Sequence, residues 1–238
     1  MHRDLSPNNI MFRIIKGKVY GVLTDYDLAS WANRLTNDYT KTSQQRTGTP
    51  PFMAHGLLDG SDLLHLYRHD EESLFYIMLI LATHYEIQAP KKKESGGVRL
   101  RKGLQELPYQ TWFDQPIYKG LAAYKKAFFS EFEHLNLSPT FEGFRGWLLH
   151  LRASFSCGFQ AKTRHDFQQE IREQLMTEPS EQPEDEVKPV AFDNETLGGH
   201  LTYSALIRPA RRPTGALKGL VIRYDPPSSP SPSPTGAV

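Results

Sequence analysis

Residues 2–25 read HRDLSPNNIMFRIIKGKVYGVLTD, and this stretch decides how the chain begins to fold. Residues 9–15 and 19–23 are rich in β-branched and aromatic side chains, and Lys16-Gly17-Lys18 separates them. This pattern predicts a β-hairpin in which the glycine supplies the positive φ angle of the turn.

Helices are predicted for most of the remaining body. Apolar residues at helical spacing predict helices over residues 70–83, 111–134 and 141–155, and a last, polar helix is predicted over residues 162–176. The first is apolar on nearly all sides after an acidic first turn, which is typical of a deeply buried helix. The expected fold class is therefore mainly α with a small β-hairpin.

The composition excludes several classes of protein. The 238 residues carry 28 Lys and Arg against 27 Asp and Glu, a net charge of +1, which argues against a dedicated nucleic-acid binder. No apolar run approaches the length of about 20 residues that crosses a bilayer, and no apolar leader follows the start. Cys157 is the single cysteine. These features predict a protein of the cytoplasm or nucleus that has no membrane contact.

The chain divides into a body and a tail. Residues 1–176 are predicted to pack, because aromatic and aliphatic residues recur there at core-forming intervals. Residues 177–189 are acidic, contain proline and indicate a linker, and residues 226–238 read PPSSPSPSPTGAV. We therefore expect residues 177–238 to be a linker and a largely disordered, flexible Ser/Pro-rich tail. A short strand at residues 217–222 is the alternative for its middle part.

Oxygen-bearing side chains stand at the outer ends of the predicted hairpin. Asp4 and Asn9 come at its start, and Asp25 follows it. The two ends of a short hairpin can converge on one pocket, and Mg²⁺ prefers such oxygen ligands. Asp4 and Asn9 taken alone are also typical of a turn or a helix cap, and Asp25 taken alone could end a strand.

Four stretches together resemble the fungal-type protein kinases. They are HRDLSPNNI, LTDYDLAS, GTPPFMA and RHDEESLFYIMLI, at residues 2–10, 23–30, 48–54 and 68–80. The resemblance covers residues 1 to about 176 and implies the carboxyl-terminal lobe of a protein-kinase-like fold. It also implies ATP and Mg²⁺ as cofactors and a protein substrate or partner.

The resemblance assigns roles to residues of the candidate site. Asp4 would be the base that accepts the proton of the substrate hydroxyl, and Thr49 would position Asp4. Asn9 and Asp25 would hold the metal. Asp70 resembles the buried aspartate that binds the backbone of the catalytic loop.

A regulatory contact is predicted beside the base. Arg3 precedes Asp4, and the stretch after residue 40 offers several hydroxyl groups. We expect a phosphate on Ser43 or Thr47 to be held by Arg3 through a charge-assisted hydrogen bond.

Three positions depart from the family pattern. Ser6 stands where most such kinases carry a lysine, and Tyr26-Asp27 replaces the Phe-Gly pair that follows the metal-binding aspartate. Ala54-His55-Gly56 replaces Ala-Pro-Glu, so the glutamate that normally anchors the activation segment is missing.

Two functions stay open. No G-x-G-x-x-G loop occurs, so we expect the amino-terminal, nucleotide-binding lobe to be absent and the chain alone to have no measurable turnover. The first function is an ATP-dependent protein serine/threonine kinase, of which this chain is a fragment. The alternative is a catalytically inactive kinase-like module that binds protein partners. The sequence leaves the oligomeric state open.

Overall fold

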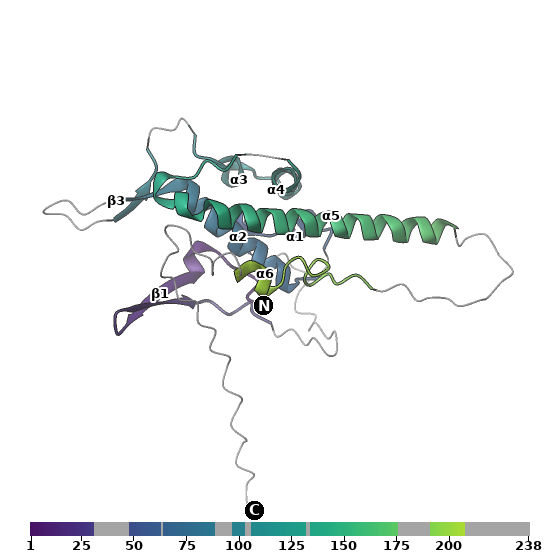
Figure 1. Ribbon diagram of the computed structural model, residues 1–238, viewed down its shortest axis with the longest axis horizontal. Helices are drawn as coiled ribbons and strands as arrows, with labels where there is room; N and C mark the ends of the chain where they lie inside the picture. The colour runs from purple at the N-terminus through teal and green to yellow at the C-terminus, as the bar shows by residue number, and fades with distance from the viewer. Residues whose placement is uncertain are drawn as a thin grey trace, which may run out of the picture.

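Figure 1 shows the computed structural model of the chain, which describes residues 1–30, 48–62, 64–88, 97–102, 106–131, 134–175 and 191–207. Within these residues helices dominate, which confirms the expected class of mainly α with a small β-hairpin. The elements in chain order are η1 (Pro7–Asn9), β1 (Ile10–Ile15), β2 (Lys18–Leu23), η2 (Pro50–Phe52), α1 (His55–Asp59), α2 (Tyr67–His84), β3 (Tyr85–Gln88), β4 (Gly97–Leu100), α3 (Thr111–Asp114), α4 (Tyr118–Ser130), η3 (Pro139–Phe144), α5 (Arg145–Leu175) and α6 (Tyr203–Ile207).

The predicted hairpin is confirmed. β1 pairs antiparallel with β2 in a register that places Ile10 opposite Leu23. Lys16 and Gly17 form the turn with φ angles of 49° and 73°. Positive φ at both positions gives the tight turn whose twist matches that of the two strands. A second hairpin, β3 with β4, was not predicted.

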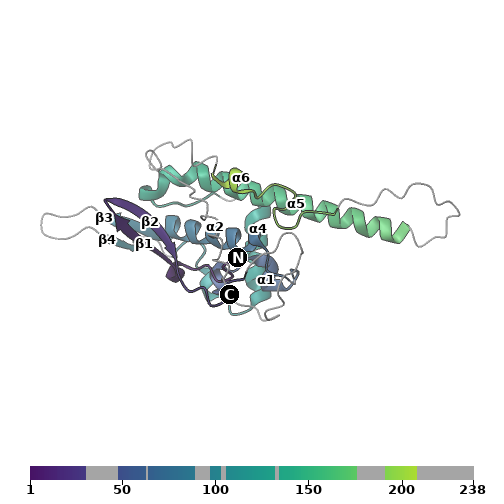
Figure 2. The same cartoon turned by 90° about the horizontal axis from the view of Figure 1, so that it is seen from below.

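The hydrophobic core forms where α2, α4 and α5 meet. α2 runs through the middle of the body, beneath α5 in Figure 2. Its Phe75 ring lies 5.9 Å from Phe128, 5.8 Å from Phe129 and 5.7 Å from Phe155, measured between ring centroids. Contacts of this kind between buried aromatic rings stabilise the core beyond the area that they bury.

The single helix predicted over residues 111–134 is wrong. α3 ends at Asp114 and α4 begins at Tyr118, with Pro116 between them. Proline has no N–H to donate and drives the preceding residue out of the helical region, and Gln115 indeed has a ψ angle of 109°. Apolar residues keep their helical spacing on both sides of Pro116, and for that reason the sequence pattern predicted one continuous helix.

The two helices predicted over residues 141–155 and 162–176 are one helix. α5 runs unbroken through 31 residues, or about 46 Å, while residues 141–144 belong to η3. Figures 1 and 2 both show its carboxyl-terminal turns extending past the other labelled elements. None of the described helices has both the length and the apolar content that a bilayer crossing requires.

Residues 191–207 belong to the packed body, although we assigned residues 177–238 to a linker and a disordered tail. Leu197 and Leu201 are both 0% exposed and belong to the core. Residues 177–190 and 208–238 lie outside the described residues, and so does the strand considered at 217–222.

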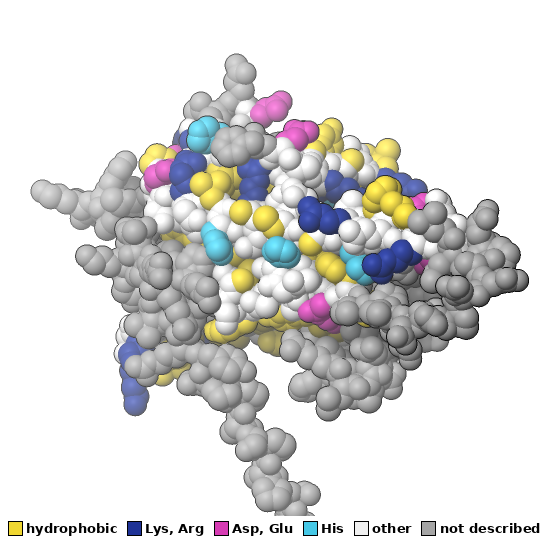
Figure 3. Space-filling model, turned by 45° about the vertical axis from the view of Figure 1, so that its right-hand side comes forward, with side chains coloured by type: hydrophobic (Ala, Val, Ile, Leu, Met, Phe, Trp, Pro, Cys, Tyr) yellow, Lys and Arg dark blue, Asp and Glu magenta, His cyan; other side chains and the backbone are white. Residues whose placement is uncertain are grey.

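The described surface carries mixed charge in the view of Figure 3. Lys and Arg side chains alternate there with Asp, Glu, His and hydrophobic side chains. No single sign of charge dominates the described part of this face, in keeping with the balanced composition.

The contact between α5 and Leu197 gives a prediction. A Cβ atom added at Gly158 would lie 2.7 Å from Leu197 Cβ. We expect Gly158→Ala to lower the free energy of unfolding by about 1–3 kcal/mol in urea titrations, because that contact must be forced apart.

Gly146→Ala is the matched control on the same helix. A Cβ atom at Gly146 would meet nothing within 4 Å, so we expect no loss and a gain of up to about 1 kcal/mol. Equal stabilities of the two variants would show that Leu197 does not pack against α5.

Candidate functional site

Asp70 joins the first residues of the chain to the central helix. Its carboxylate is buried in the first turn of α2 and accepts hydrogen bonds from the backbone N–H groups of His2 (2.6 Å) and Arg3 (2.9 Å). The His65 ring lies 3.0 Å away through Nε2. Burial alone would raise the pKa of Asp70, but His65 and the two N–H groups outweigh it and lower the pKa.

These bonds hold a strained backbone. Arg3 has a φ angle of 74°, a region that residues with a side chain avoid. Two hydrogen bonds from consecutive N–H groups to one carboxylate fix this conformation. The chain direction at Asp4, the next residue, is therefore set by a side chain 66 positions away in the sequence.

Asp4 lies against the segment that begins at Gly48. Asp4 Oδ1 accepts hydrogen bonds from the Thr49 backbone N–H (3.1 Å) and from the Thr49 hydroxyl (3.3 Å). Gly48 has a φ angle of 128°, and a Cβ atom there would lie 3.2 Å from Met53 Cε and 3.8 Å from Asp4 Oδ1. The structure thus brings together Asp4 and Thr49, and the role of Asp4 as a base stays a prediction.

Asn9 connects the loop to the end of β2. Its side-chain Nδ2 donates to the Asp4 backbone oxygen (2.8 Å), and its own backbone oxygen accepts from the Thr24 N–H (3.0 Å). His2 lies 2.8 Å through Nε2 from the Thr24 backbone oxygen. Asp25 follows directly, exposed and with a φ angle of 60°. Asp4, Asn9 and Asp25 therefore all stand at one end of the hairpin.

The oxygen donors at this end fit a hard cation. Because Nδ2 of Asn9 is engaged by Asp4, its Oδ1 remains as an acceptor, and Asp25 adds a carboxylate. One amide and one carboxylate oxygen suit Mg²⁺ when phosphate and water supply its other ligands. Within the described ranges, no three His, Cys, Asp or Glu side chains form a group that could hold a metal by themselves.

Two of the predicted regulatory residues are not among the residues that the structure describes. Ser43 and Thr47 lie beyond the described residues, so the predicted pairing of a phosphate with Arg3 stays a prediction.

The Tyr26 ring, which stands in the place of the usual phenylalanine, is 5.1 Å from the His2 ring.

A buried glutamate anchors the segment that follows Thr49. Glu72 Oε1 lies 2.8 Å from the backbone nitrogen and 2.9 Å from Nδ1 of His55, and 2.6 Å from the Tyr76 hydroxyl. Burial alone would raise the pKa of Glu72, but the His55 charge and these hydrogen bonds lower it to about 2. Glu72 therefore holds the segment at His55 to the central helix.

A buried lysine anchors the same segment from α4. The Lys125 ammonium group, 0% exposed, donates to the backbone oxygens of Met53 (2.6 Å) and Pro50 (3.3 Å) and lies 4.1 Å from the Tyr76 ring centroid. Burial lowers its pKa well below the usual value. We did not predict either anchor, although the position of Lys125 on an apolar stripe was a signal for it.

A cavity of about 650 Å³ lies beside the candidate site. Apolar side chains from the loop, the end of the hairpin and α2 form most of its lining, among them Leu5, Leu23, Tyr26 and Leu74. The acidic residues Asp70 and Glu71 also line it. Glu71 was not singled out in the sequence, where it reads as one of several acids in the first turn.

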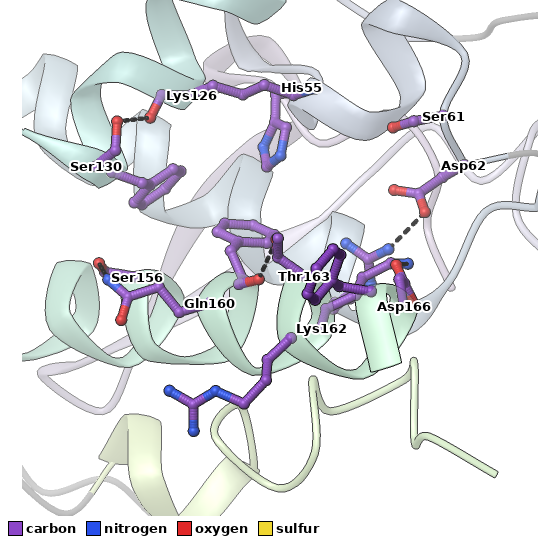
Figure 4. Close-up of a pocket in the computed structure, with 15 residues that line it drawn as sticks. His55, Ser61, Asp62, Lys126, Ser130, Ser156, Gln160, Lys162, Thr163 and Asp166 are labelled. Atoms are coloured by element: carbon purple, nitrogen blue, oxygen red, sulfur yellow. Dashed lines mark hydrogen bonds and ion pairs between the residues drawn. The ribbon is translucent and has the colours of Figure 1, made fainter. Parts of the chain in front are cut away.

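Figure 4 shows a second cavity, of about 710 Å³, between α4, α5 and the loop after α1. Three of the cations that line it are paired with carboxylates: Lys126 with Asp59 (2.5 Å), Lys162 with Asp166 (2.7 Å) and Arg68 with Asp62 (2.7 Å). These pairs make the second cavity a weaker candidate for a charged ligand than the first.

Residues 1–82 match the family model of the fungal protein kinases. The match includes Asp4, Asn9, Asp25, Thr49 and Asp70, and it confirms the resemblance over 82 of the 238 residues. No curated protein and no solved structure gives a significant match to the chain.

The bonds of Asp70 give a second prediction. Asp70→Asn leaves one acceptor oxygen and adds an amide group among donors, so we expect a loss of about 2–4 kcal/mol in the free energy of unfolding. Asp114→Asn, an exposed position on α3, is the matched control and should change it by less than about 0.5 kcal/mol. Similar values for both variants would mean that the loop does not depend on Asp70.

The low pKa of Glu72 gives a third prediction. The pKa of Glu72 is about 2 in the fold against a usual value of 4.5, so its stabilising effect is complete above pH 4.5 and is lost as the pH falls through 2. We expect Glu72→Gln to be less stable than the unchanged chain by about 2–4 kcal/mol at neutral pH. Unfolding measured from neutral pH to about pH 2 should show this difference shrinking on acidification. A constant difference would contradict the assignment.

Proposed function

We propose that this chain carries the catalytic loop and the carboxyl-terminal lobe of a kinase that transfers the γ-phosphoryl group of ATP to a protein serine or threonine. The observation that supports it best is the pair of hydrogen bonds from Thr49 to Asp4 Oδ1. They fix a carboxylate at the end of the hairpin where the oxygen donors of Asn9 and Asp25 also stand. The family match over residues 1–82 supports the same reading.

Asp4 would act as the base. The substrate hydroxyl would give its proton to the Asp4 carboxylate while its oxygen forms a bond to the γ-phosphorus, and ADP would leave. A base is effective only when it is positioned, and Thr49 and Asn9 hold the side chain and the backbone of Asp4 respectively.

Asn9 and Asp25 would hold Mg²⁺. When bound, this ion neutralises charge on the phosphate oxygens. Ser6 is buried and stands where most such kinases have a lysine, so it brings no positive charge to the transferred group. We propose that the cation bound by Asn9 and Asp25 provides a larger share of the charge stabilisation here.

An interaction module is the alternative. The observation that favours it is the apolar surface of the hairpin, where Met11, Phe12, Ile14, Ile15, Val19 and Tyr20 are exposed. Apolar patches of this kind mark surfaces that contact other proteins. We propose an intracellular location in either case, since the exposed thiol of Cys157 is unpaired and suits a reducing compartment.

The fourth prediction separates the two functions. We expect the 238-residue chain alone to transfer no radiolabel from ATP to a protein acceptor, because it contains no glycine-rich loop to cover the nucleotide. Fusion to the nucleotide-binding lobe of a fungal-type protein kinase should produce transfer. Asp4→Asn in that fusion should reduce the rate at least about 100-fold.

Asp114→Asn in the same fusion serves as the control and should leave transfer unchanged. Transfer that survives Asp4→Asn would remove the proposed base. A fusion that folds, binds ATP and transfers nothing would leave the interaction module as the function.

A further inference from the structure

Glu71 is a buried acid that has the Tyr67 side chain as its hydrogen-bonding neighbour and, among the described residues, no ion-pair partner. It is 7% exposed, and within the described part of the chain neither carboxylate oxygen accepts a hydrogen bond of normal length and angle. Its neighbours on α2 differ: the Asp70 carboxylate is bonded to two backbone N–H groups and a histidine, and Glu72 to His55 and Tyr76. A buried carboxylate left in this state is costly, so it marks a place where a partner group is missing.

The surroundings of Glu71 keep its carboxyl group protonated up to an unusually high pH unless a positive charge is placed beside it. Burial, followed by the nearby carboxylates of Asp70 and Glu195, raises the pKa of Glu71 to about 8, although the Tyr67 hydroxyl opposes this change. Glu195 belongs to the segment at 191–207 and is held by the Tyr67 backbone N–H at 2.7 Å. Three acidic side chains thus gather around one side of the α2 amino-terminal turns.

This side of α2 is also its least covered face. Tyr67, Glu71, Leu74, Met78 and Leu81 follow one another at spacings of four and three residues and so lie on one stripe of the helix. Leu74 is 43% exposed on a helix that is otherwise largely buried, and Tyr67, Met78 and Leu81 are half-buried. The stripe extends about 21 Å along the axis, which is longer than a small molecule.

The cavity of about 650 Å³ opens along the first half of this stripe. The exposed side chains of Leu23 and Tyr26 border it from the end of the hairpin. The surface therefore combines an apolar wall with one unpaired acid on the central helix.

We propose that the α2 stripe binds a partner polypeptide that presents an arginine or lysine among apolar side chains, with the cation paired to Glu71. The apolar side chains of the partner would cover Leu74, Leu23 and Tyr26, and its cation would satisfy the buried carboxylate. This proposal goes beyond the kinase function, because it uses none of the residues assigned to phosphoryl transfer.

The test uses two short peptides on the full chain. The probes are N-acetyl-Leu-Arg-Leu-amide and the same peptide with citrulline, which has the shape of arginine but no charge. We expect the arginine peptide to bind at least about ten-fold more tightly in NMR titrations at about 1 mM, because a charge-assisted bond forms in a site that excludes water. The difference should grow from about pH 6 to pH 8.5, since pairing requires Glu71 to lose its proton.

Two variants locate the effect. Glu71→Gln should remove the preference for arginine, and Glu170→Gln, an exposed position on α5, should keep it. Glu71→Gln should also unfold at a higher temperature than the unchanged chain, most clearly near pH 8.5, where the unchanged chain must bury a charge.

Equal binding of the two peptides to the unchanged chain, or no binding of either, would overturn the proposal without any variant. A preference that survives in Glu71→Gln would place the cation elsewhere and would also overturn it. Transfer assays play no part, so failure of the kinase function leaves this test intact.

Discussion

The contact on which the rest of the structure depends is the one between the Asp70 carboxylate and two successive backbone N–H groups. Only proline among the possible substitutions at His2 or Arg3 would remove a backbone N–H group, so the bond is specified mainly from the α2 side. It holds Arg3 at a positive φ angle that the isolated loop would leave. This turn sets the positions of Asp4 and Asn9. Thr49 then donates a hydrogen bond to Asp4, and Thr24 donates one to Asn9.

α2 carries three consecutive acids with three different environments. Asp70 faces the loop, Glu72 faces the segment after Thr49, and Glu71 faces the cavity. A helix turns by about 100° per residue, so neighbours in sequence must point in different directions. A single turn of helix therefore contacts the loop, the anchored segment and the open stripe.

Features that depend on neighbouring residues, such as the hairpin, could be predicted from the sequence. Features that depend on contacts between distant residues could not. Lys-Gly between β-rich runs was enough for the hairpin, and the apolar run after Asp70 was enough for α2. Pro116 carried the signal for the break between α3 and α4, but apolar spacing on either side outweighed it. α5 continues through residues 156–161, and Leu197, from a distant part of the chain, packs against it at Gly158. The Glu72 and Lys125 anchors likewise join elements whose proximity no local pattern encodes.

The packing of residues 191–207 also determines when the hydrophobic core can be completed during synthesis of the chain. The Tyr67 N–H is bonded to Glu195, 128 residues further along, and the buried Leu197 and Leu201 complete the core from the same segment. At the usual speed of translation, roughly 6–26 s separate the appearance of these two partners. Throughout that interval residues 191–207 are not yet available to pack against α2. Chaperones and other chains can therefore contact this central helix until the segment has been made.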